Sequence, residues 1–219
     1  MHDKSFILFD LDGTLTDPEA GITRSVRYAL NSFGIEVEKL SDLRKFIGPP
    51  LAPAFMDYYG FSAEQAHAAV LKYREYFTDT GIYENALYPE IPGLLQSLES
   101  GGRTLVLATT KPTVFARRIL EYFNIAGYFA FVSGSELTGE RSEKAEVIGH
   151  ALTRVPGISV GASVMIGDRK HDILGAKAVG MASIGVLYGY GGRGELEEAG
   201  ADALVEDIAG LAALLGQSF

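Results

Sequence analysis

The chain has 219 residues, 47% of them apolar, and a formal net charge of −9. This length suits one sizeable domain, or a core with a smaller inserted domain. The acidic charge argues against a nucleic-acid-binding surface. The absence of cysteine excludes disulfides, thiolate metal sites and a thiol nucleophile, and it is compatible with a reducing compartment.

The sequence carries no sign of a membrane span or a secretion signal. No apolar stretch approaches the roughly 18 residues that a membrane-spanning helix requires. The amino terminus has no long apolar segment of the kind that directs secretion. We therefore expect a soluble, cytoplasmic protein.

The first predicted strand ends in two carboxylates. The apolar run Phe6–Phe9 is too short for a core helix and leads into Asp10, Leu11, Asp12 and Gly13. Because side chains alternate along a strand, Asp10 and Asp12 should point the same way. Two such carboxylates repel each other unless a cation lies between them or one of them is protonated. An Asx turn at Asp12 and Gly13 is the plainer alternative.

The segment that follows this strand predicts a small all-helical domain. Between residues 16 and 85, apolar residues recur at helical spacing, and glycine and proline separate the stretches. No strand pattern occurs there. We therefore expect a catalytic core formed by residues 1–15 and 86–219, and an inserted helical cap formed by residues 16–85.

From residue 88 onward, predicted strands and helices alternate. The strands are short apolar runs, expected at 104–108, 129–132, 162–166, 183–186 and 203–205. The helices between them are expected at about 91–100, 112–123, 142–153 and 171–179, with a last one after 207. This alternation predicts an α/β fold with a Rossmann-like, mostly parallel sheet and helices on both faces. Ligands bind such sheets beyond the carboxyl ends of the strands.

Polar residues follow three of these strands at their carboxyl ends. They are Asp10, Asp12, Thr109, Thr110, Lys111, Asp168 and Asp172. Carboxylates, hydroxyls and a nearby lysine are what a hard cation and a phosphoryl group require. If a helix begins near Asp168, then Asp168 and Asp172 share one face of it. The plainer interpretation of these two acids is that the helix dipole favours them at a helix start.

These motifs resemble those of a known family. Asp10-Leu11-Asp12-Gly13-Thr14, Thr109, Lys144 and Gly167-Asp168 with Asp172 resemble the four motifs of the haloacid dehalogenase superfamily. The helical insert resembles the type-one cap of its phosphoglycolate phosphatase-like and 5′-nucleotidase-like branch. The resemblance covers essentially the whole chain. The first motif is strongly specific, whereas the threonine and the lysine are informative only in this order.

The resemblance implies a role for each acid. Asp10 would be the nucleophile that attacks phosphorus and forms an aspartyl-phosphate. Asp12 would protonate the leaving oxygen and then activate water. Asp10, the backbone carbonyl of Asp12 and Asp168 would bind Mg²⁺, with Asp172 as a further ligand or as support.

The resemblance also implies a phosphate-binding group. Thr109 would donate a hydrogen bond to a phosphoryl oxygen, and Lys144 would offset the negative charge around the nucleophile. Lys144 is predicted at the amino end of a helix, where the dipole disfavours a lysine, and such a misplaced residue is a mild indication of function.

Four further residues are candidates for substrate binding. Thr110 and Lys111 follow the second core strand and could contact the phosphoryl group. Arg24 and Lys45 lie in the helical insert and could meet an anionic substrate, although both would equally suit a solvated surface.

A glycine-rich stretch near the carboxyl end matches the spacing of a dinucleotide-binding motif. It runs Gly189-Tyr190-Gly191-Gly192-Arg193-Gly194. About 25 residues follow it, too few for a complete βαβ unit with a ribose-binding acid. We interpret it as a loop that follows the strand at 183–186.

Together these features predict a Mg²⁺-dependent phosphomonoesterase that hydrolyses a small phosphorylated metabolite through an aspartyl-phosphate. A 5′-nucleotide and phosphoglycolate are both candidates, and aromatic residues in the insert, with Tyr188 and Tyr190, favour the nucleotide slightly. A phosphomutase of the β-phosphoglucomutase type could use the same acid pair. A receiver-like, phosphate-binding regulatory domain is the non-enzymatic alternative, but it would not need the insert. We expect no nucleic-acid polymer or membrane as a partner, and the sequence does not predict the oligomeric state.

Overall fold

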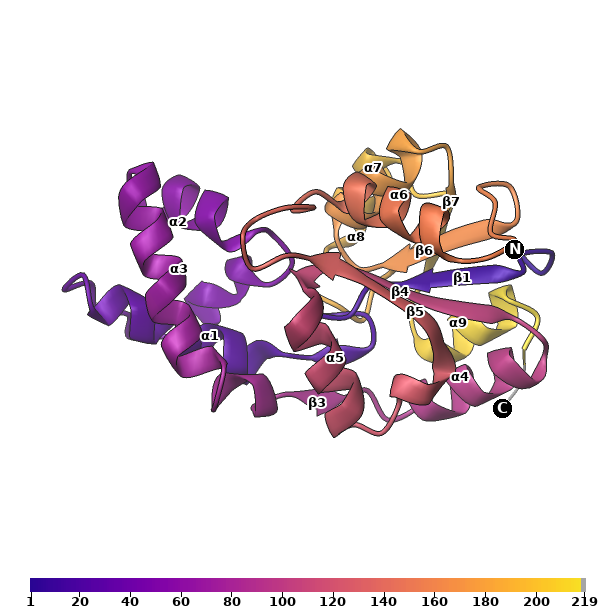
Figure 1. The fold of residues 1–219 in the computed structure, drawn as a ribbon, viewed down its shortest axis with the longest axis horizontal. Helices are drawn as coiled ribbons and strands as arrows, with labels where there is room; N and C mark the ends of the chain where they lie inside the picture. Colours follow the sequence, from indigo (N-terminus) through magenta and orange to yellow (C-terminus); the bar gives the residue numbers. More distant parts are fainter. Residues whose placement is uncertain (218–219) are drawn as a thin grey trace. The chain divides into compact units, whose positions relative to one another are not determined.

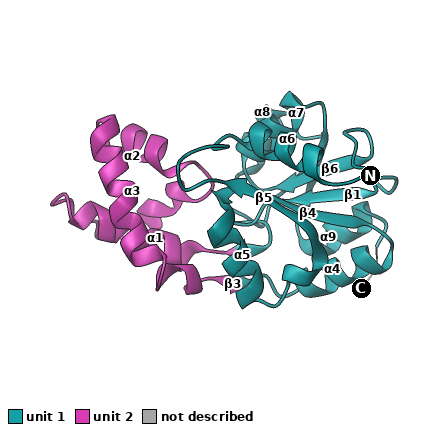
Figure 2. Cartoon of the chain, viewed as in Figure 1, with its two compact units in different colours: residues 1–16, 87–219 teal, residues 17–86 magenta. Residues whose placement is uncertain are grey.

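The computed structural model describes residues 1–217, and the chain divides into two compact units (Figure 2). Unit 1 consists of Met1–Thr16 and the chain from Leu87 onward, and unit 2 is Asp17–Ala86. Unit 2 is thus inserted into unit 1 directly after the first strand and the loop that follows it.

Unit 1 is built around a six-stranded parallel sheet. Its strands are β1 (Phe6–Phe9), β4 (Thr104–Pro112), β5 (Phe129–Ser135), β6 (Ser163–Gly167), β7 (Ala182–Val186) and β8 (Ala203–Val205). Their order is β5-β4-β1-β6-β7-β8, and each neighbouring pair is parallel. The prediction of an α/β fold with a mostly parallel sheet is therefore confirmed.

Helices cover both faces of this sheet. They are α4 (Ile91–Ser100), α5 (Thr113–Tyr122), α6 (Lys144–Arg154), α7 (Lys170–Ala178), α8 (Arg193–Ala199) and α9 (Ile208–Leu214), with a short 3₁₀ helix, η3 (Ala126–Tyr128). Figure 1 shows α6 and α7 on one side of the sheet and α4 and α9 on the other. Because both faces are covered, consecutive residues of β1 are all buried: Ile7, Leu8 and Phe9 are at most 1% exposed.

One core cluster fixes the position of α6. Leu8, Val106 and Met165 come from three adjacent strands and pack with Val147 and Ala151 of α6. All five side chains are fully buried. Burial stabilises each of the larger ones by roughly 1.5–3 kcal/mol. This packing holds the first residue of α6 at the carboxyl edge of the sheet.

Unit 2 is mostly helical. It contains α1 (Glu19–Asn31), η1 (Leu40–Phe46), α2 (Leu51–Tyr59), α3 (Ala63–Phe77) and η2 (Gly81–Tyr83), where η marks a 3₁₀ helix. Aromatic side chains form much of its core: the ring centres of Phe46 and Phe55 lie 4.9 Å apart, and those of Phe55 and Phe61 lie 5.8 Å apart. These aromatic pairs join η1, α2 and the turn before α3.

The expectation that residues 16–85 contain no strand is wrong at residues 16 and 17. The outgoing chain forms β2 (Thr16–Asp17), and the returning chain forms β3 (Ala86–Leu87) just beyond that segment. The two pair as a separate two-stranded sheet. Two connections that run side by side can pair their backbone N–H and C=O groups. The sequence of one connection does not reveal that the other lies beside it.

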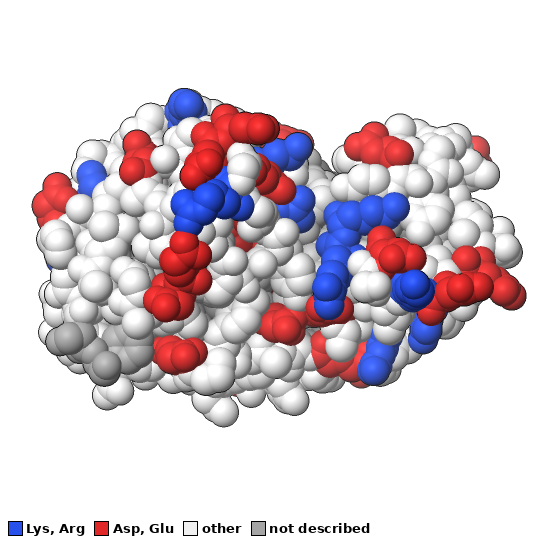
Figure 3. Space-filling view, turned by 180° about the vertical axis from the view of Figure 1, so that it is seen from behind, with Lys and Arg blue, Asp and Glu red and all other residues white. Residues whose placement is uncertain are grey.

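The charged side chains are mixed in sign. Figure 3 shows both acidic and basic side chains on the face that it draws, many of them beside side chains of opposite charge. Among residues 1–217, no helix combines the length and the hydropathy that crossing a membrane requires.

Candidate active site

The site residues predicted in unit 1 converge where three strands end. Strand β1 lies between β4 and β6, and Phe9 at its end is opposite Leu107 of β4 and Ile166 of β6. Asp10 directly follows β1, and Asp168 directly follows β6. Because the strands are parallel, their carboxyl ends meet at one edge of the sheet.

Backbone hydrogen bonds, within the loop and to β6, hold the loop after β1 in place. The Asp10 N–H donates to the carbonyl of Ile166 at 2.9 Å, which joins the start of the loop to β6. The N–H of Gly13 donates to the carbonyl of Thr16 at 2.7 Å. Gly13 has a φ of +82°, a conformation that favours glycine. Asp10 and Asp12 are consequently fixed in a buried turn, 5% and 8% exposed.

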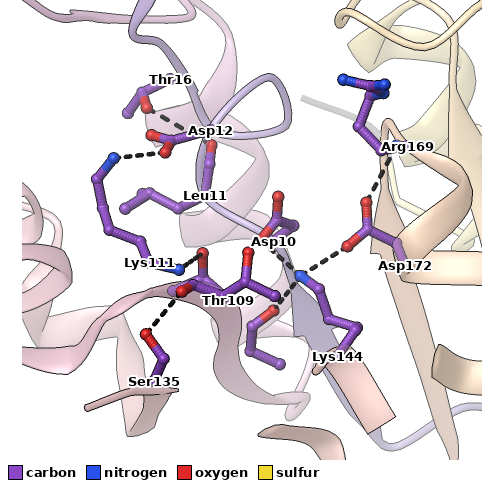
Figure 4. A network of polar contacts seen from close by, with 12 residues as sticks. Asp10, Leu11, Asp12, Thr16, Thr109, Lys111, Ser135, Lys144, Arg169 and Asp172 are labelled. Atoms are coloured by element: carbon purple, nitrogen blue, oxygen red, sulfur yellow. Dashed lines mark hydrogen bonds and ion pairs between the residues drawn. The ribbon is translucent and has the colours of Figure 1, made fainter. Parts of the chain in front are cut away.

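Lys144 contacts two of the predicted acids (Figure 4). It is the first residue of α6 and is buried. Its Nζ lies 2.7 Å from Oδ1 of Asp10, 2.6 Å from Oδ1 of Asp172 and 2.9 Å from the carbonyl of Ala108. These three partners account for the three donors of an ammonium group.

The charge state of Lys144 follows from these contacts. Burial alone would lower the pKa of its ammonium group, but the carboxylates of Asp10 and Asp172 outweigh burial and raise that pKa to about 12. Lys144 is therefore positively charged at neutral pH and partly neutralises the acids around it.

Three carboxylates form a cluster suited to a cation. Asp10, Asp168 and Asp172 each offer one oxygen atom, and these atoms lie within 4.8 Å of one another. Burial raises the pKa of Asp168, and the charges of Asp172 and Asp10 raise it further. Burial also raises the pKa of Asp172, to about 6, against the opposing effect of Lys144. Asp168 and Asp172 therefore keep their protons more readily than exposed carboxyl groups do, and a bound cation would favour their ionised forms.

One oxygen of this cluster has no protein partner. Oδ2 of Asp168 accepts a hydrogen bond of 2.7 Å from the N–H of Tyr190. Oδ1 of Asp168 is buried and has no hydrogen-bond partner among residues 1–217. An unpartnered buried carboxylate oxygen is costly unless a cation binds it. Because Mg²⁺ prefers oxygen ligands, the donor set fits that ion.

Asp168 and Asp172 meet, but not on one helix face as the sequence suggested. Helix α7 begins at Lys170, so Asp168 precedes it, and Arg169 has an extended backbone with φ −120° and ψ 156°. Oδ2 of Asp172 accepts a 3.0 Å hydrogen bond from the N–H of Arg169. The two acids converge because the chain turns between them, not because of helical spacing.

The side chain of Asp12 is not part of the carboxylate cluster and contacts Lys111 instead. Its Oδ2 accepts a hydrogen bond from Nζ of Lys111 at 2.5 Å, and its Oδ1 is buried with no partner in the described part of the chain. Burial raises the pKa of Asp12, although Lys111 opposes the shift. A carboxyl group that keeps its proton more readily suits acid–base chemistry. Lys111, expected to contact substrate, is thus paired with Asp12 in this structure.

The two threonines of the second strand end are also brought into the site region. Thr109 is 2% exposed, and its Oγ1 accepts a hydrogen bond from the N–H of Lys111 at 3.2 Å. The carbonyl of Thr110 accepts one from Oγ of Ser135 at 2.7 Å. Ser135, which ends β5, was not predicted as a site residue. The predicted strand ends at residue 132, whereas β5 ends at Ser135. A polar residue at the carboxyl end of a strand is the signal that would have identified Ser135.

The predicted substrate contacts in unit 2 have partners within that unit. Arg24 forms an ion pair with Glu84. The ammonium of Lys45 lies 4.7 Å from the ring centre of Tyr58 and 5.1 Å from that of Tyr59. Substrate binding by Arg24 and Lys45 stays a prediction.

Comparison with known proteins identifies a family and several relatives. A family model described as haloacid dehalogenase-like hydrolase matches residues 7–186. A 5′-nucleotidase of Pseudomonas aeruginosa is 49% identical over 209 residues, 95% of this chain and 94% of that protein. A phosphoglycolate phosphatase of Vibrio parahaemolyticus is 30% identical over 197 residues, 86% of each chain.

Another relative and a solved structure extend the comparison. Tyrosine-protein kinase PtkA of Mycobacterium tuberculosis is 38% identical over 186 residues, which are 84% of this chain but 62% of that longer protein. The crystal structure of a protein described as a predicted phosphatase from Clostridium acetobutylicum has a TM-score of 0.93 and 48% identity, covering 95% of this chain and 96% of that one.

Proposed function

The chain belongs to the haloacid dehalogenase-like hydrolases and is a phosphatase. From this premise we propose that it hydrolyses a small phosphorylated metabolite, with Asp10 as the nucleophile and Mg²⁺ as the cofactor. One observation supports this most: Asp10 contacts Lys144 and belongs to a buried cluster of three carboxylates. Such a site can hold a cation and accept the charge of a phosphoryl group.

The proposed reaction has two steps. A carboxylate oxygen of Asp10 attacks phosphorus, and the bond to the leaving oxygen breaks while Asp12 gives that oxygen its proton. Asp12, now ionised, takes a proton from water, and the water oxygen attacks the phosphorus of the aspartyl-phosphate. Inorganic phosphate leaves and Asp10 is regenerated. The raised pKa of Asp12 supports its role as the acid of the first step.

Several residues would hold the phosphoryl group and the cofactor. Asp10, Asp168 and the backbone carbonyl of Asp12 would bind Mg²⁺, with Asp172 as a further ligand or as support for the others. When bound, the ion would offset the charge that develops on the phosphoryl oxygens. Thr109 would donate its hydroxyl to one of these oxygens. Thr110 and Lys111 are proposed to contact the same group, and release of Lys111 from Asp12 would accompany that contact.

The substrate proposed first is a 5′-nucleotide, with phosphoglycolate as the second candidate. The relative named 5′-nucleotidase is 49% identical, and the phosphoglycolate phosphatase is 30% identical. We assign the selection of the leaving group to unit 2, as a cap that excludes water when substrate binds. Its aromatic side chains, together with Arg24 and Lys45, are the proposed substrate contacts.

Substitution of the two acids tests the mechanism. We expect Asp10→Asn to abolish phosphate release from p-nitrophenyl phosphate, because an amide is not a comparable nucleophile. Asp12→Asn should slow turnover by roughly 10²–10⁴-fold while Mg²⁺ affinity is retained. EDTA should abolish the wild-type activity, and Mg²⁺ should restore it. Wild-type turnover in Asp10→Asn would disprove the assignment of the nucleophile.

A substrate panel separates the alternatives. Values of kcat/KM for nucleoside 5′-monophosphates and phosphoglycolate should favour a nucleotide by roughly tenfold or more, the size of discrimination that a few binding contacts supply. A preference for phosphoglycolate would reverse the order of the two proposals. An isomerised sugar phosphate, formed only after priming with a bisphosphate, would instead identify a mutase.

A further inference from the structure

The glycine-rich stretch that resembled a dinucleotide motif lies against the carboxylate cluster. Residues 187–191, here called the glycine loop, lie between β7 and Gly192, the residue before α8. We propose that the glycine loop is a positioning element of the metal site, which orients Asp168 so that one of its oxygens faces the cation. This inference rests on the proposed function, because it takes Asp168 as a ligand of Mg²⁺.

The first observation is a backbone hydrogen bond to the carboxylate. The N–H of Tyr190 donates to Oδ2 of Asp168 at 2.7 Å. Because Asp168 is completely buried, this donor replaces the water that would otherwise solvate Oδ2. The bond distinguishes the two oxygens of Asp168, since it occupies Oδ2 and leaves Oδ1 without a protein partner among residues 1–217.

The second observation is the close approach of two glycines to Asp168. A Cβ atom on Gly189 would lie 2.3 Å from Cβ of Asp168, and one on Gly191 would lie 1.9 Å from the Asp168 carbonyl oxygen. Neither glycine has a positive φ. Proximity to Asp168, and not an unusual backbone conformation, therefore requires glycine at these two positions.

The third observation is that the glycine loop also contacts the loop after β1. A Cβ on Gly189 would lie 2.4 Å from the carbonyl oxygen of Gly13, and a Cβ on Gly13 would lie 2.2 Å from Oδ2 of Asp168. The hydroxyl of Tyr188 donates to the carbonyl of Thr14 at 3.0 Å. The glycine loop thus joins the segment that carries Asp10 to the residue that completes the metal site.

These contacts explain why the motif resembles a nucleotide-binding sequence. In a dinucleotide site, glycines let the backbone approach a pyrophosphate closely. Here Gly189 lets the loop backbone approach the side chain of the chain's own Asp168, and Gly191 lets it approach the Asp168 backbone carbonyl. In both kinds of site, oxygen atoms that lie close to the main chain leave room only for glycine.

The test compares Gly189 of the loop with Gly192, which directly follows the loop, in the full-length protein. In Gly189→Ala the new methyl group meets Asp168, whereas a Cβ on Gly192 has no atom within 4 Å, so Gly192→Ala is the matched control. Mg²⁺ affinity is measured by isothermal titration calorimetry, and the melting temperature of the metal-free protein reports on folding. We expect Gly189→Ala to weaken Mg²⁺ binding by roughly 10–100-fold, as changes beside a metal ligand do. Gly192→Ala should stay within about twofold of wild type.

The outcomes separate this inference from the function on which it rests. Equal Mg²⁺ affinity in Gly189→Ala and Gly192→Ala overturns the role of the glycine loop, even if Gly189→Ala melts at a lower temperature. If Asp168→Asn binds Mg²⁺ as tightly as wild type, the metal assignment of the proposed function fails, and the inference fails with it.

A gentler variant decides the question if Gly189→Ala does not fold. Tyr188→Phe removes only the hydroxyl that bonds to Thr14. Loss of one such hydrogen bond should weaken Mg²⁺ binding by roughly two- to tenfold. An unchanged affinity in a folded Tyr188→Phe protein would then overturn the inference.

Discussion

At the scale of single residues, Lys144 has the strongest set of charged contacts in the site. Its pKa in the folded protein, about 12, exceeds the ordinary lysine value of 10.5. A raised lysine pKa means that the stabilisation by the charged form is fully present below about pH 10.5 and is lost as the pH rises through about 12. At neutral pH, Lys144 therefore stabilises the fold as well as the charge of Asp10, the proposed nucleophile.

Replacement of this lysine should affect both properties. Lys144→Met leaves Asp10 and Asp172 without their shared cation, and breaking such buried pairs costs roughly 3–5 kcal/mol. We expect a fall of about that size in the free energy of unfolding of the metal-free protein, measured in urea at pH 7. Phosphatase activity should be lost. The control is Lys39→Met, since Lys39 is exposed. Similar unfolding curves for the two variants would show that Lys144 has no such structural role.

At the scale of elements, the contact between α6 and α7 determines where Lys144 can lie. Gly175 of α7 faces the base of the Lys144 side chain, and a Cβ on Gly175 would lie 2.6 Å from Cγ of Lys144. The atom in the way is near the backbone, so the lysine cannot avoid it by moving its far end. A glycine in the middle of a helix, normally unfavourable, is thus required by the helix packing.

Gly175→Ala should therefore reduce activity without any change to a catalytic group. Displacement of Lys144 by about 1 Å is expected to lower kcat by up to roughly 100-fold. The matched control is Gly149→Ala in α6, where a Cβ would meet no atom within 4 Å. That variant should keep its activity and gain about 0.5–1 kcal/mol of stability. The two variants are compared by kcat and by urea unfolding, and equal kcat values would refute the packing argument.

At the scale of the whole molecule, the proposed metal site joins distant parts of the chain. The three clustered acids follow β1, follow β6 and lie in α7. A cation that binds only the folded protein stabilises it by mass action, by about 2.7 kcal/mol at a concentration 100 times the Kd. The fold of unit 1 and the proposed cofactor are therefore thermodynamically linked.

We expect MgCl₂ at that concentration to raise the melting temperature by roughly 5–10 °C relative to NaCl of equal ionic strength. Protons compete with the cation for these carboxylates, and the pKa of Asp172 is raised to about 6, so the increase should shrink as the pH falls below that value. Thermal scans at pH 5.5 and 7.5 measure both effects. Asp168→Asn is the control that should show little increase. An equal increase in Asp168→Asn would locate the stabilising ion elsewhere.

The sequence by itself determined the parallel sheet and the acids at its edge, because strand patterns and strand-end residues are local features. It also carried the family resemblance through Asp10, Asp12 and Asp168. The resemblance also placed Lys144 near Asp10, 134 positions away. Only the tertiary structure decided that Lys144 also pairs with Asp172, that Lys111 pairs with Asp12, 99 positions away, and that Tyr190 binds Asp168, 22 positions away. Such pairs depend on how helices and loops pack over the sheet. Local sequence preferences do not specify contacts between residues so far apart in the chain.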